Sequence, residues 1–210
     1  MFNEFGFVTP KQERAKKAID DIELAIELLS KNFNLEGITA RDISDRSGYA
    51  LGTIFHHFKK LDKIFIYLFL ARRKRAYEKV IEIMEKHPSD QPLIVLLSDV
   101  INFLMDEMLR VDRKNFIFTV RLLLNRSKNP QLMNTQIDVL IPYWMNANQQ
   151  DKTNTVLNYS EDELRLRLRA IQSIVRSPFL EENALAGTAK HREMSLNLAL
   201  QIFSQPPCSE

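Results

Sequence analysis

Residues 38–64 read ITARDISDRSGYALGTIFHHFKKLDKI, and this stretch decides how the N-terminal part of the chain folds. Thr39 can cap a short helix, because its hydroxyl can accept a hydrogen bond from an amide of the first turn. The side chain of Asp42, three positions on, can in turn accept a hydrogen bond from the backbone amide of Thr39. Gly48 can supply the positive φ angle that a sharp turn between two helices requires. A second helix is predicted to begin at about Ala50.

The second predicted helix has an apolar side and a polar side. At helical spacing, the apolar side comprises Leu51, Ile54 and Phe58. The other side can present groups to a phosphate or a base edge, and it comprises Gly52, Thr53, His56 and Lys59. Two short helices joined by a glycine turn, with one such face left free, are typical of a DNA-binding helix-turn-helix.

The same stretch resembles the N-terminal domain of the TetR family of bacterial transcriptional regulators. The family pattern joins a capping Thr, Asp-Ile-Ala, a turn Gly and Gly-Thr-(Leu/Ile)-(Tyr/Phe)-x-(His/Tyr)-Phe to a helix start rich in Lys and Glu. The matching residues are Thr39, Asp42, Ile43, Gly48, Gly52, Thr53, Ile54, Phe55, His57, Phe58, Lys59 and Asp62. With the preceding helix, the resemblance extends over roughly residues 10–65.

Four positions depart from the family's usual residues, and one of them, Ser44 in place of the common Ala, is a small-for-small change. Ala50 and Lys60 stand where the family usually has Ser, which removes two N-caps worth about 1 kcal/mol each. Phe55 replaces the frequent Tyr, so a hydroxyl that would contact a phosphate is missing. The missing Ser caps and Phe55 are the support for an alternative, in which the chain is a helical enzyme or a protein-interaction adaptor that retains a non-functional helix-turn-helix.

The resemblance implies a ligand-responsive DNA-binding regulator. The chain is expected to be a homodimeric repressor that a small lipophilic effector releases from its double-stranded DNA operator. The residues expected to contact DNA are Thr39, Ala50, Leu51, Gly52, Thr53, Phe55, His56, His57, Lys59 and Lys60.

Composition favours an all-α fold in two parts. The 210 residues are 45% hydrophobic and include only 5 Gly and 8 Pro, which suits long helices better than a turn-rich β fold. We predict a three-helix DNA-binding domain over residues 1–65 and a helical ligand-binding and dimerisation bundle over residues 66–204. Residues 205–210 are predicted to form a disordered tail.

The net charge of +2 does not indicate a nucleic-acid partner by itself, but its distribution does. Residues 49–75 hold seven basic side chains and one acidic side chain. Lys59, Lys60 and Lys63 come directly after the recognition helix, where they are well placed for phosphates.

Other kinds of chemistry find little support. The single thiol, Cys208, can form no disulfide within one chain, which fits a reducing cytoplasm. The longest apolar run, residues 64–71, is too short to cross a bilayer, so no membrane partner is expected. No catalytic motif, cofactor motif or metal-binding pair of His or Cys is present, so the chain is expected to be no enzyme and to bind no metal or cofactor.

Further helices are expected along the rest of the chain. A long helix over residues 61–87 should follow the motif, and Pro142 should end or kink a helix that starts at Pro130. Residues 146–158 are polar and predict a loop. Ser160 and Glu163 predict a capping box, and the helix that they begin should break near Pro178.

Two further sets of residues are candidates for binding. A group of large apolar and polar-tipped side chains could line an effector pocket, although any one of them taken singly is more often an ordinary core residue. They are Asn102, Phe103, Phe116, Phe118, Met133, Tyr143 and Trp144. The last two helices are apolar on more than one side, which favours a four-helix dimer interface as in the family. The interface residues expected there are Leu164, Leu168, Ile171, Leu196, Leu200 and Phe203.

Overall fold

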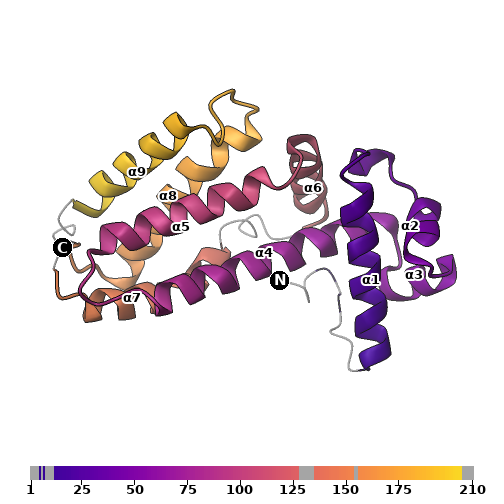
Figure 1. Cartoon of the computed structure of the whole chain (residues 1–210), viewed down its shortest axis with the longest axis horizontal. Coiled ribbons are helices and arrows are strands. Elements are labelled where there is room, and N and C mark those ends of the chain that lie inside the picture. The colour runs from indigo at the N-terminus through magenta and orange to yellow at the C-terminus, as the bar shows by residue number, and fades with distance from the viewer. Residues whose placement is uncertain (1–4, 6, 8–11, 128–134, 154–155, 205–210) are drawn as a thin grey trace. The chain divides into compact units, whose positions relative to one another are not determined.

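The computed structural model of the chain describes residues 5, 7, 12–127, 135–153 and 156–204 (Figure 1). Every regular element among these residues is a helix, so the predicted all-α class is confirmed. The described chain divides into two compact units. Unit 1 is Met1–Lys74 with Val111–Pro130, and unit 2 is Arg75–Arg110 with Gln131–Glu210.

Unit 1 contains the predicted helix-turn-helix. Its elements are α1 (Glu13–Leu29), the 3-10 turn η2 (Leu35–Gly37), α2 (Ala40–Ser47), α3 (Leu51–Phe58), the first part of α4 (Leu61–Glu85), and α6 (Arg113–Arg126). Helix α1 packs on α2, and α2 packs on α3.

Helix α6 belongs to unit 1, whereas the sequence placed residues 66–204 in one domain. Asn115 of α6 is buried, and its side-chain oxygen accepts a hydrogen bond from the amide of Leu35 in η2 at 2.7 Å. The ring of Phe118 meets Phe65 of α4 edge-on, with centroids 5.9 Å apart. A buried amide side chain with a partner is stabilising, whereas one without a partner is costly. These contacts bind α6 to the turn that leads into α2.

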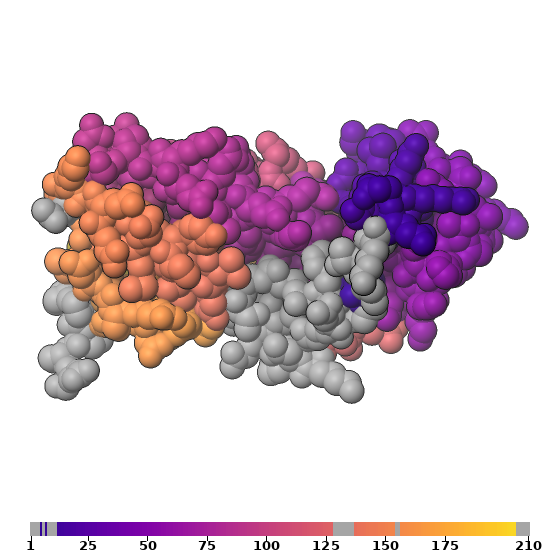
Figure 2. All heavy atoms as spheres, turned by 90° about the horizontal axis from the view of Figure 1, so that it is seen from below, coloured from indigo at the N-terminus to yellow at the C-terminus, as the bar shows by residue number. Residues whose placement is uncertain are grey.

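Unit 2 is a bundle around one apolar core. Its elements are the rest of α4, α5 (Leu93–Leu109), the 3-10 helix η3 (Thr135–Leu140), α7 (Ile141–Gln150), α8 (Glu161–Leu180) and α9 (Ala189–Ser204). Helix α9 lies along both α5 and α8 (Figure 1). The indole of Trp144 stacks on the ring of Phe203 at 4.8 Å inside this core. In Figure 2 the orange atoms of η3, α7 and α8 form a continuous surface of unit 2.

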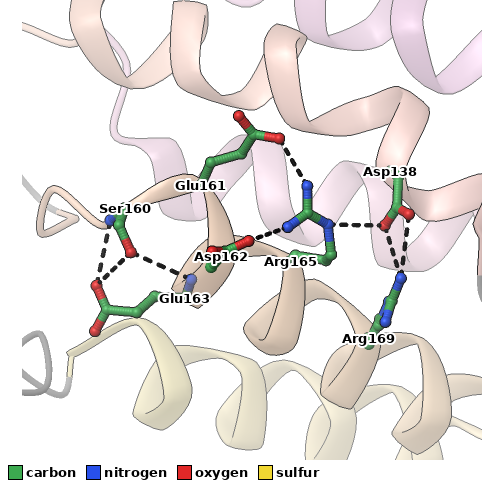
Figure 3. Close-up of polar contacts among 7 residues, drawn as sticks. All are labelled: Asp138, Ser160, Glu161, Asp162, Glu163, Arg165 and Arg169. Atoms are coloured by element: carbon green, nitrogen blue, oxygen red, sulfur yellow. Dashed lines mark hydrogen bonds and ion pairs between the residues drawn. The ribbon is translucent and has the colours of Figure 1, made fainter.

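An ion-pair network attaches η3 to α8 (Figure 3). The Asp138 carboxylate in η3 pairs with the guanidinium groups of Arg165, at 3.4 Å, and Arg169, at 3.1 Å. Arg165 also pairs with Glu161 and Asp162 in the first turn of α8. These contacts fix the point at which α8 meets η3.

The capping box predicted at the start of α8 is present (Figure 3). The Ser160 hydroxyl accepts a hydrogen bond from the Glu163 amide at 3.3 Å, and the Glu163 carboxylate accepts one from the Ser160 amide at 3.2 Å. The box satisfies amides that no helical carbonyl can reach.

Two predictions about the middle of the chain are wrong. Pro142 lies in the first turn of α7 and does not end a helix, because an amide there needs no helical acceptor and its loss costs nothing. Residues 146–150, predicted as part of a loop, form the second half of α7. The Asn and Gln side chains there lie on the outer side of a helix whose buried residues are Ile141, Trp144 and Ala147, so their polarity alone does not distinguish this helix from a loop.

The predicted break near Pro178 is also wrong. Helix α8 continues through Pro178 to Leu180, and Phe179 beside it is buried. Proline has no N–H to donate to the carbonyl four residues earlier, which is that of Ile174. The Nε2 atom of His191 lies 3.2 Å from that carbonyl oxygen and donates the missing hydrogen bond. A side chain of α9 therefore supplies the hydrogen bond that Pro178 cannot make.

Candidate nucleic-acid interface

Helix α2 begins with the capping box that the sequence predicts. The Thr39 hydroxyl accepts a hydrogen bond from the Asp42 amide at 3.2 Å, and the Asp42 carboxylate accepts one from the Thr39 amide at 2.8 Å. The Asp42 carboxylate also accepts a hydrogen bond from the Thr39 hydroxyl at 2.6 Å. The hydrogen bonds from Thr39 lower the pKa of Asp42. Thr39 itself is exposed. The start of the helix-turn-helix is therefore fixed locally.

The turn between α2 and α3 is fixed by Gly48 and by side chains from two helices. Gly48 has a φ of 76°, as predicted, and ends α2. The Ser44 hydroxyl donates to the Tyr49 carbonyl at 2.7 Å, and the Tyr49 hydroxyl donates to the Asp21 carboxylate of α1 at 2.9 Å. The bond to Asp21 raises the pKa of the Tyr49 hydroxyl. Helix α1 therefore helps to set the direction in which α3 leaves the turn.

Helix α3 buries one side and leaves the opposite side to solvent. Ile54 and Phe58 are buried in unit 1. At 100° per residue, Gly52 and His56 lie on the opposite side, and both are exposed. Thr53 and Phe55 lie on the flanks and are half-buried. Leu51, expected on the core side, is 39% exposed because it lies at the end of the helix, beyond the packed stripe.

The first turn of α3 leaves space for a close neighbour. Ala50 is the N-cap residue and its side chain makes no capping hydrogen bond. A Cβ atom added to Gly52 would meet no atom within 4 Å. The fold therefore does not need a glycine there, and glycine lowers helix stability relative to alanine by roughly 1 kcal/mol. An incoming partner that must approach the backbone closely would explain its presence.

The end of α3 carries backbone strain at a basic residue. Lys59 has a φ of 65°, in the region that favours glycine, and its amide donates to the Phe55 carbonyl at 2.9 Å. Such a conformation costs a residue with a Cβ atom about 1–2 kcal/mol. Strain of this kind is often retained at functional sites. Lys59 and Lys60 are both exposed, whereas the Lys63 ammonium donates to the Phe5 carbonyl at 2.9 Å.

His56 and His57 contact each other edge-on, with ring centroids 5.3 Å apart. His57 also contacts the Phe58 ring, at 6.5 Å, so that it covers the buried end of the helix. Burial, and to a smaller extent the charge of His56, lowers the pKa of His57. His57 is therefore expected to be neutral at pH 7, while His56 faces solvent.

The residues predicted to bind an effector are divided between the two units. Phe116 and Phe118 lie in unit 1, where the Phe116 ring is 6.2 Å from Phe69. Trp144 is 2% exposed and belongs to the core of unit 2. Phe103 and Tyr143 pack against that core. The Asn102 side-chain oxygen, also in unit 2, accepts a hydrogen bond from Arg192 at 3.3 Å. Met133 lies outside the described residues.

The residues predicted to form a dimer interface lie mostly inside unit 2. Four of them are buried within a single chain and belong to its core, namely Leu164, Leu168, Ile171 and Phe203. Leu196 is half-buried, and Leu200 is 37% exposed. Spacing alone does not distinguish the side of a helix that packs within one chain from the side that packs against a second chain. The apolar side chains that do face solvent on these helices are Leu166, Met194, Leu198 and Leu200.

Two positions in unit 1 were missed from the sequence. Asn115 looked like any polar helix residue, because its partner Leu35 is 80 positions away. Phe7 precedes the first predicted helix, where no pattern indicates packing. Only the aromatic content of the first seven residues, which include three Phe, could have pointed to contact with a core.

Comparison with known proteins identifies the fold. No family model matches the sequence, and no curated protein is significantly similar to it. Solved structures do match: a protein described as a TetR-family transcriptional regulator from Mesorhizobium loti has a TM-score of 0.63 and 13% identity, covering 91% of this chain and 98% of its own. The chain therefore has the fold of TetR-family transcriptional regulators.

Two further structures support the same assignment. The fatty acid degradation regulator FadR from Bacillus halodurans has a TM-score of 0.58 and 16% identity, covering 93% of this chain and 97% of its own. A TetR family transcriptional regulator from Pseudomonas syringae pv. tomato has a TM-score of 0.53 and 16% identity, covering 93% and 96%. The resemblance first seen over residues 10–65 thus extends over most of the chain.

The described residues show neither a metal-binding cluster nor a membrane span. No group of three or more His, Cys, Asp or Glu side chains lies close enough to hold a metal ion in the described part of the chain. None of the described helices is long and apolar enough to cross a membrane.

Proposed function

We propose that the chain is a DNA-binding transcriptional regulator and not an enzyme. The observation that carries the proposal is the exposed side of α3, where Gly52 and His56 stand opposite the buried Ile54 and Phe58. A short helix held by a capped α2 and a fixed turn, with one side free, is the arrangement that enters a DNA major groove. The shared fold of the three regulators supports the same reading.

The proposed DNA contacts fall into two groups. Phosphate contacts would come from the exposed cations Lys59 and Lys60 and from the helix starts near Thr39 and Ala50. Base edges would be read by the exposed side of α3 and its half-buried flanks, where the candidates are Leu51, Gly52, Thr53, Phe55 and His56. His57 is expected to act mainly by covering Phe58.

We further propose that the chain acts as a homodimer. Two copies are needed to read a two-half-site operator, because one recognition helix covers only a single half-site. The exposed apolar side chains of α8 and α9 are the surface that a second copy would cover, and Leu166, at 67% exposure, is the most open of them. Isolated exposed apolar residues are ordinary, but several on two adjoining helices favour an interface.

The chain is also proposed to be a repressor that a small lipophilic effector releases. A ligand can release DNA only by binding the non-operator conformation more tightly. Phe103, Tyr143 and Met145 are half-buried around the unit 2 core and are the side chains there that could adapt to a ligand. Because one structural neighbour is a fatty acid degradation regulator, fatty acids and their acyl esters are the first compounds to test.

Binding to DNA tests the main proposal. Purified protein would be titrated into fluorescent duplexes made from the DNA flanking its gene and from random genomic fragments, at several salt concentrations. We expect tight binding to one site and weaker, salt-dependent binding to the others. If the protein bound none of the duplexes in a salt-dependent way, the proposal would be refuted and an adaptor that retains the fold would be favoured.

Effector release needs a separate measurement. Thermal-shift screening of lipophilic compounds should find one that raises the melting temperature, and the same compound should weaken operator binding. Stabilisation without any change in operator affinity would leave the DNA-binding role intact and refute induction.

A further inference from the structure

Phe5 and Phe7 pack against α4 ahead of the first helix. Each side chain is 7% exposed. The Phe7 ring meets the Tyr67 ring of α4 edge-on at 5.3 Å, and the Phe5 and Phe7 centroids are 6.4 Å apart. We call Phe5 and Phe7 the N-terminal aromatic pair. Their burial shows that these two residues are packed into unit 1.

The aromatic contacts continue to the end of α3. The Tyr67 ring meets the Phe58 ring edge-on at 5.4 Å, and Phe58 is the last residue of α3. Edge-to-face arrangements of this kind are favourable because the positive edge of one ring faces the negative face of the other. The N-terminal aromatic pair thus supports α3 through Tyr67 and Phe58.

Lys63 is held by the same two residues. Its ammonium group donates a hydrogen bond to the Phe5 carbonyl at 2.9 Å and lies 5.9 Å from the centroid of the Phe7 ring. A carbonyl oxygen and an aromatic face both attract a cation, so they fix the position of this side chain. Lys60, three positions earlier, is exposed and has no such partner in the contacts of the described chain.

We propose that the N-terminal aromatic pair forms part of the DNA-binding unit: it withholds Lys63 from DNA phosphates and fixes the end of α3 through Tyr67 and Phe58. The inference rests on the proposed function, because it concerns how the same interface is built. Lys63 and Phe7 are then positioning residues, and Lys60 is a direct phosphate contact. The two lysines should differ in their effect on the salt dependence of binding.

The salt dependence of DNA binding tests this difference. Each phosphate contact contributes about 0.9 to the slope of log K against log salt. Lys60→Met should flatten the slope by about 0.9, whereas Lys63→Met should keep the slope of the unmodified protein. Phe7→Ala should free Lys63 and steepen the slope by about 0.9, and the double variant with Lys63→Met should lose that increase. Equal flattening by Lys60→Met and Lys63→Met would overturn the inference.

A second measurement needs no DNA. Brief acetylation of the folded protein, followed by mass spectrometry, reports how accessible each lysine amine is. We expect Lys63 to react several-fold more slowly than Lys60, and to react faster in Phe7→Ala. Phe7→Leu keeps an apolar side chain without the ring, so it gives the same comparison if Phe7→Ala does not fold. Equal reactivity of the two lysines in the unmodified protein would overturn the inference, whereas a lack of binding to any duplex would refute only the proposed function.

Discussion

The ring of His191 replaces a backbone donor that α8 lacks at Ile174. Pro178 has no N–H, and the Nε2 atom of His191 lies 3.2 Å from the Ile174 carbonyl oxygen. The other ring nitrogen, Nδ1, accepts the Gly187 amide at 3.0 Å, so the proton of the neutral ring is on Nε2. His191 is buried, and it satisfies one group on α8 and one in the turn before α9.

The first prediction concerns this replacement. His191→Ala leaves a part-buried carbonyl and a part-buried amide without their partner, and should lower the free energy of unfolding by roughly 2–4 kcal/mol. Adding Pro178→Ala restores an N–H that can reach the Ile174 carbonyl, so the double variant should recover about 1 kcal/mol or more. Urea unfolding measures both values. Equal stability of the single and double variants would show that His191 does not act through Ile174.

The second prediction separates stability from DNA binding at two glycines. Gly52→Ala should raise the free energy of unfolding by about 0.5–1 kcal/mol, because its Cβ meets no atom within 4 Å and alanine favours a helix. The same change should weaken DNA binding at least tenfold, because the methyl group stands on the exposed side of α3. Gly48→Ala is the control, and it should lower stability because of the φ of 76°.

A gain in stability for Gly52→Ala with unchanged affinity for the operator would contradict close approach at this position. Thermal unfolding and fluorescence titration at one fixed salt concentration give the two quantities.

The third prediction uses the strained backbone at Lys59. Lys59→Gly should raise the free energy of unfolding by about 0.5–1 kcal/mol, because glycine adopts a positive φ without steric cost. It should also flatten the salt dependence of DNA binding by about 0.9, because one phosphate contact is lost. Glu182, at φ 54° in unit 2, provides the matched control. Glu182→Gly should stabilise the protein and leave the salt slope unchanged.

The fourth prediction concerns assembly. Leu166→Glu together with Leu198→Glu should convert a dimer to a monomer without loss of helix content, because both side chains are exposed in the single chain. Leu168→Ala is the contrasting change. It should lower the free energy of unfolding by about 2–4 kcal/mol because Leu168 is a core residue. Light scattering at micromolar concentration reports the mass, and a protein that is already monomeric would refute the proposed interface.

The fifth prediction concerns the pH dependence of stability. The pKa of His57 is lowered in the folded protein, so the unfolded chain takes up this proton first as the pH falls. Below the unfolded pKa of about 6.5, stability should therefore decrease until the pH passes the lower folded pKa. His57→Gln should remove that part of the decrease. Identical pH profiles between pH 7 and pH 5 for the two proteins would contradict the burial of His57.

Features of the fold that depend on neighbouring residues could be predicted from the sequence. Thr39 and Asp42 form the predicted capping box because both members lie within one helical turn. Gly48 adopts the predicted positive φ because a two-helix turn offers few alternatives. The exposed side of α3 also follows from local spacing, apart from Leu51 at the helix end.

Features that depend on distant partners could not be predicted in this way. Pro178 reads as a helix break because the compensating donor, His191, lies on another helix. Leu168 reads as an interface residue because periodicity shows that a side is apolar without showing what covers it. Asn115 and Phe7 have no local signal, because their contacts with Leu35 and Tyr67 exist only in three dimensions.

The missing cap at Ala50 leaves the first amides of α3 without a side-chain acceptor. The Ala50 carbonyl accepts hydrogen bonds from the amides of Thr53 and Ile54. The methyl side chain of Ala50 cannot accept a hydrogen bond from the earlier amides of the first turn. A phosphate oxygen at this helix end would take the place of the absent hydroxyl. The amide hydrogens of the first turn would then exchange rapidly with solvent in the free protein and slowly in the complex, so that the DNA itself completes the helix that reads it.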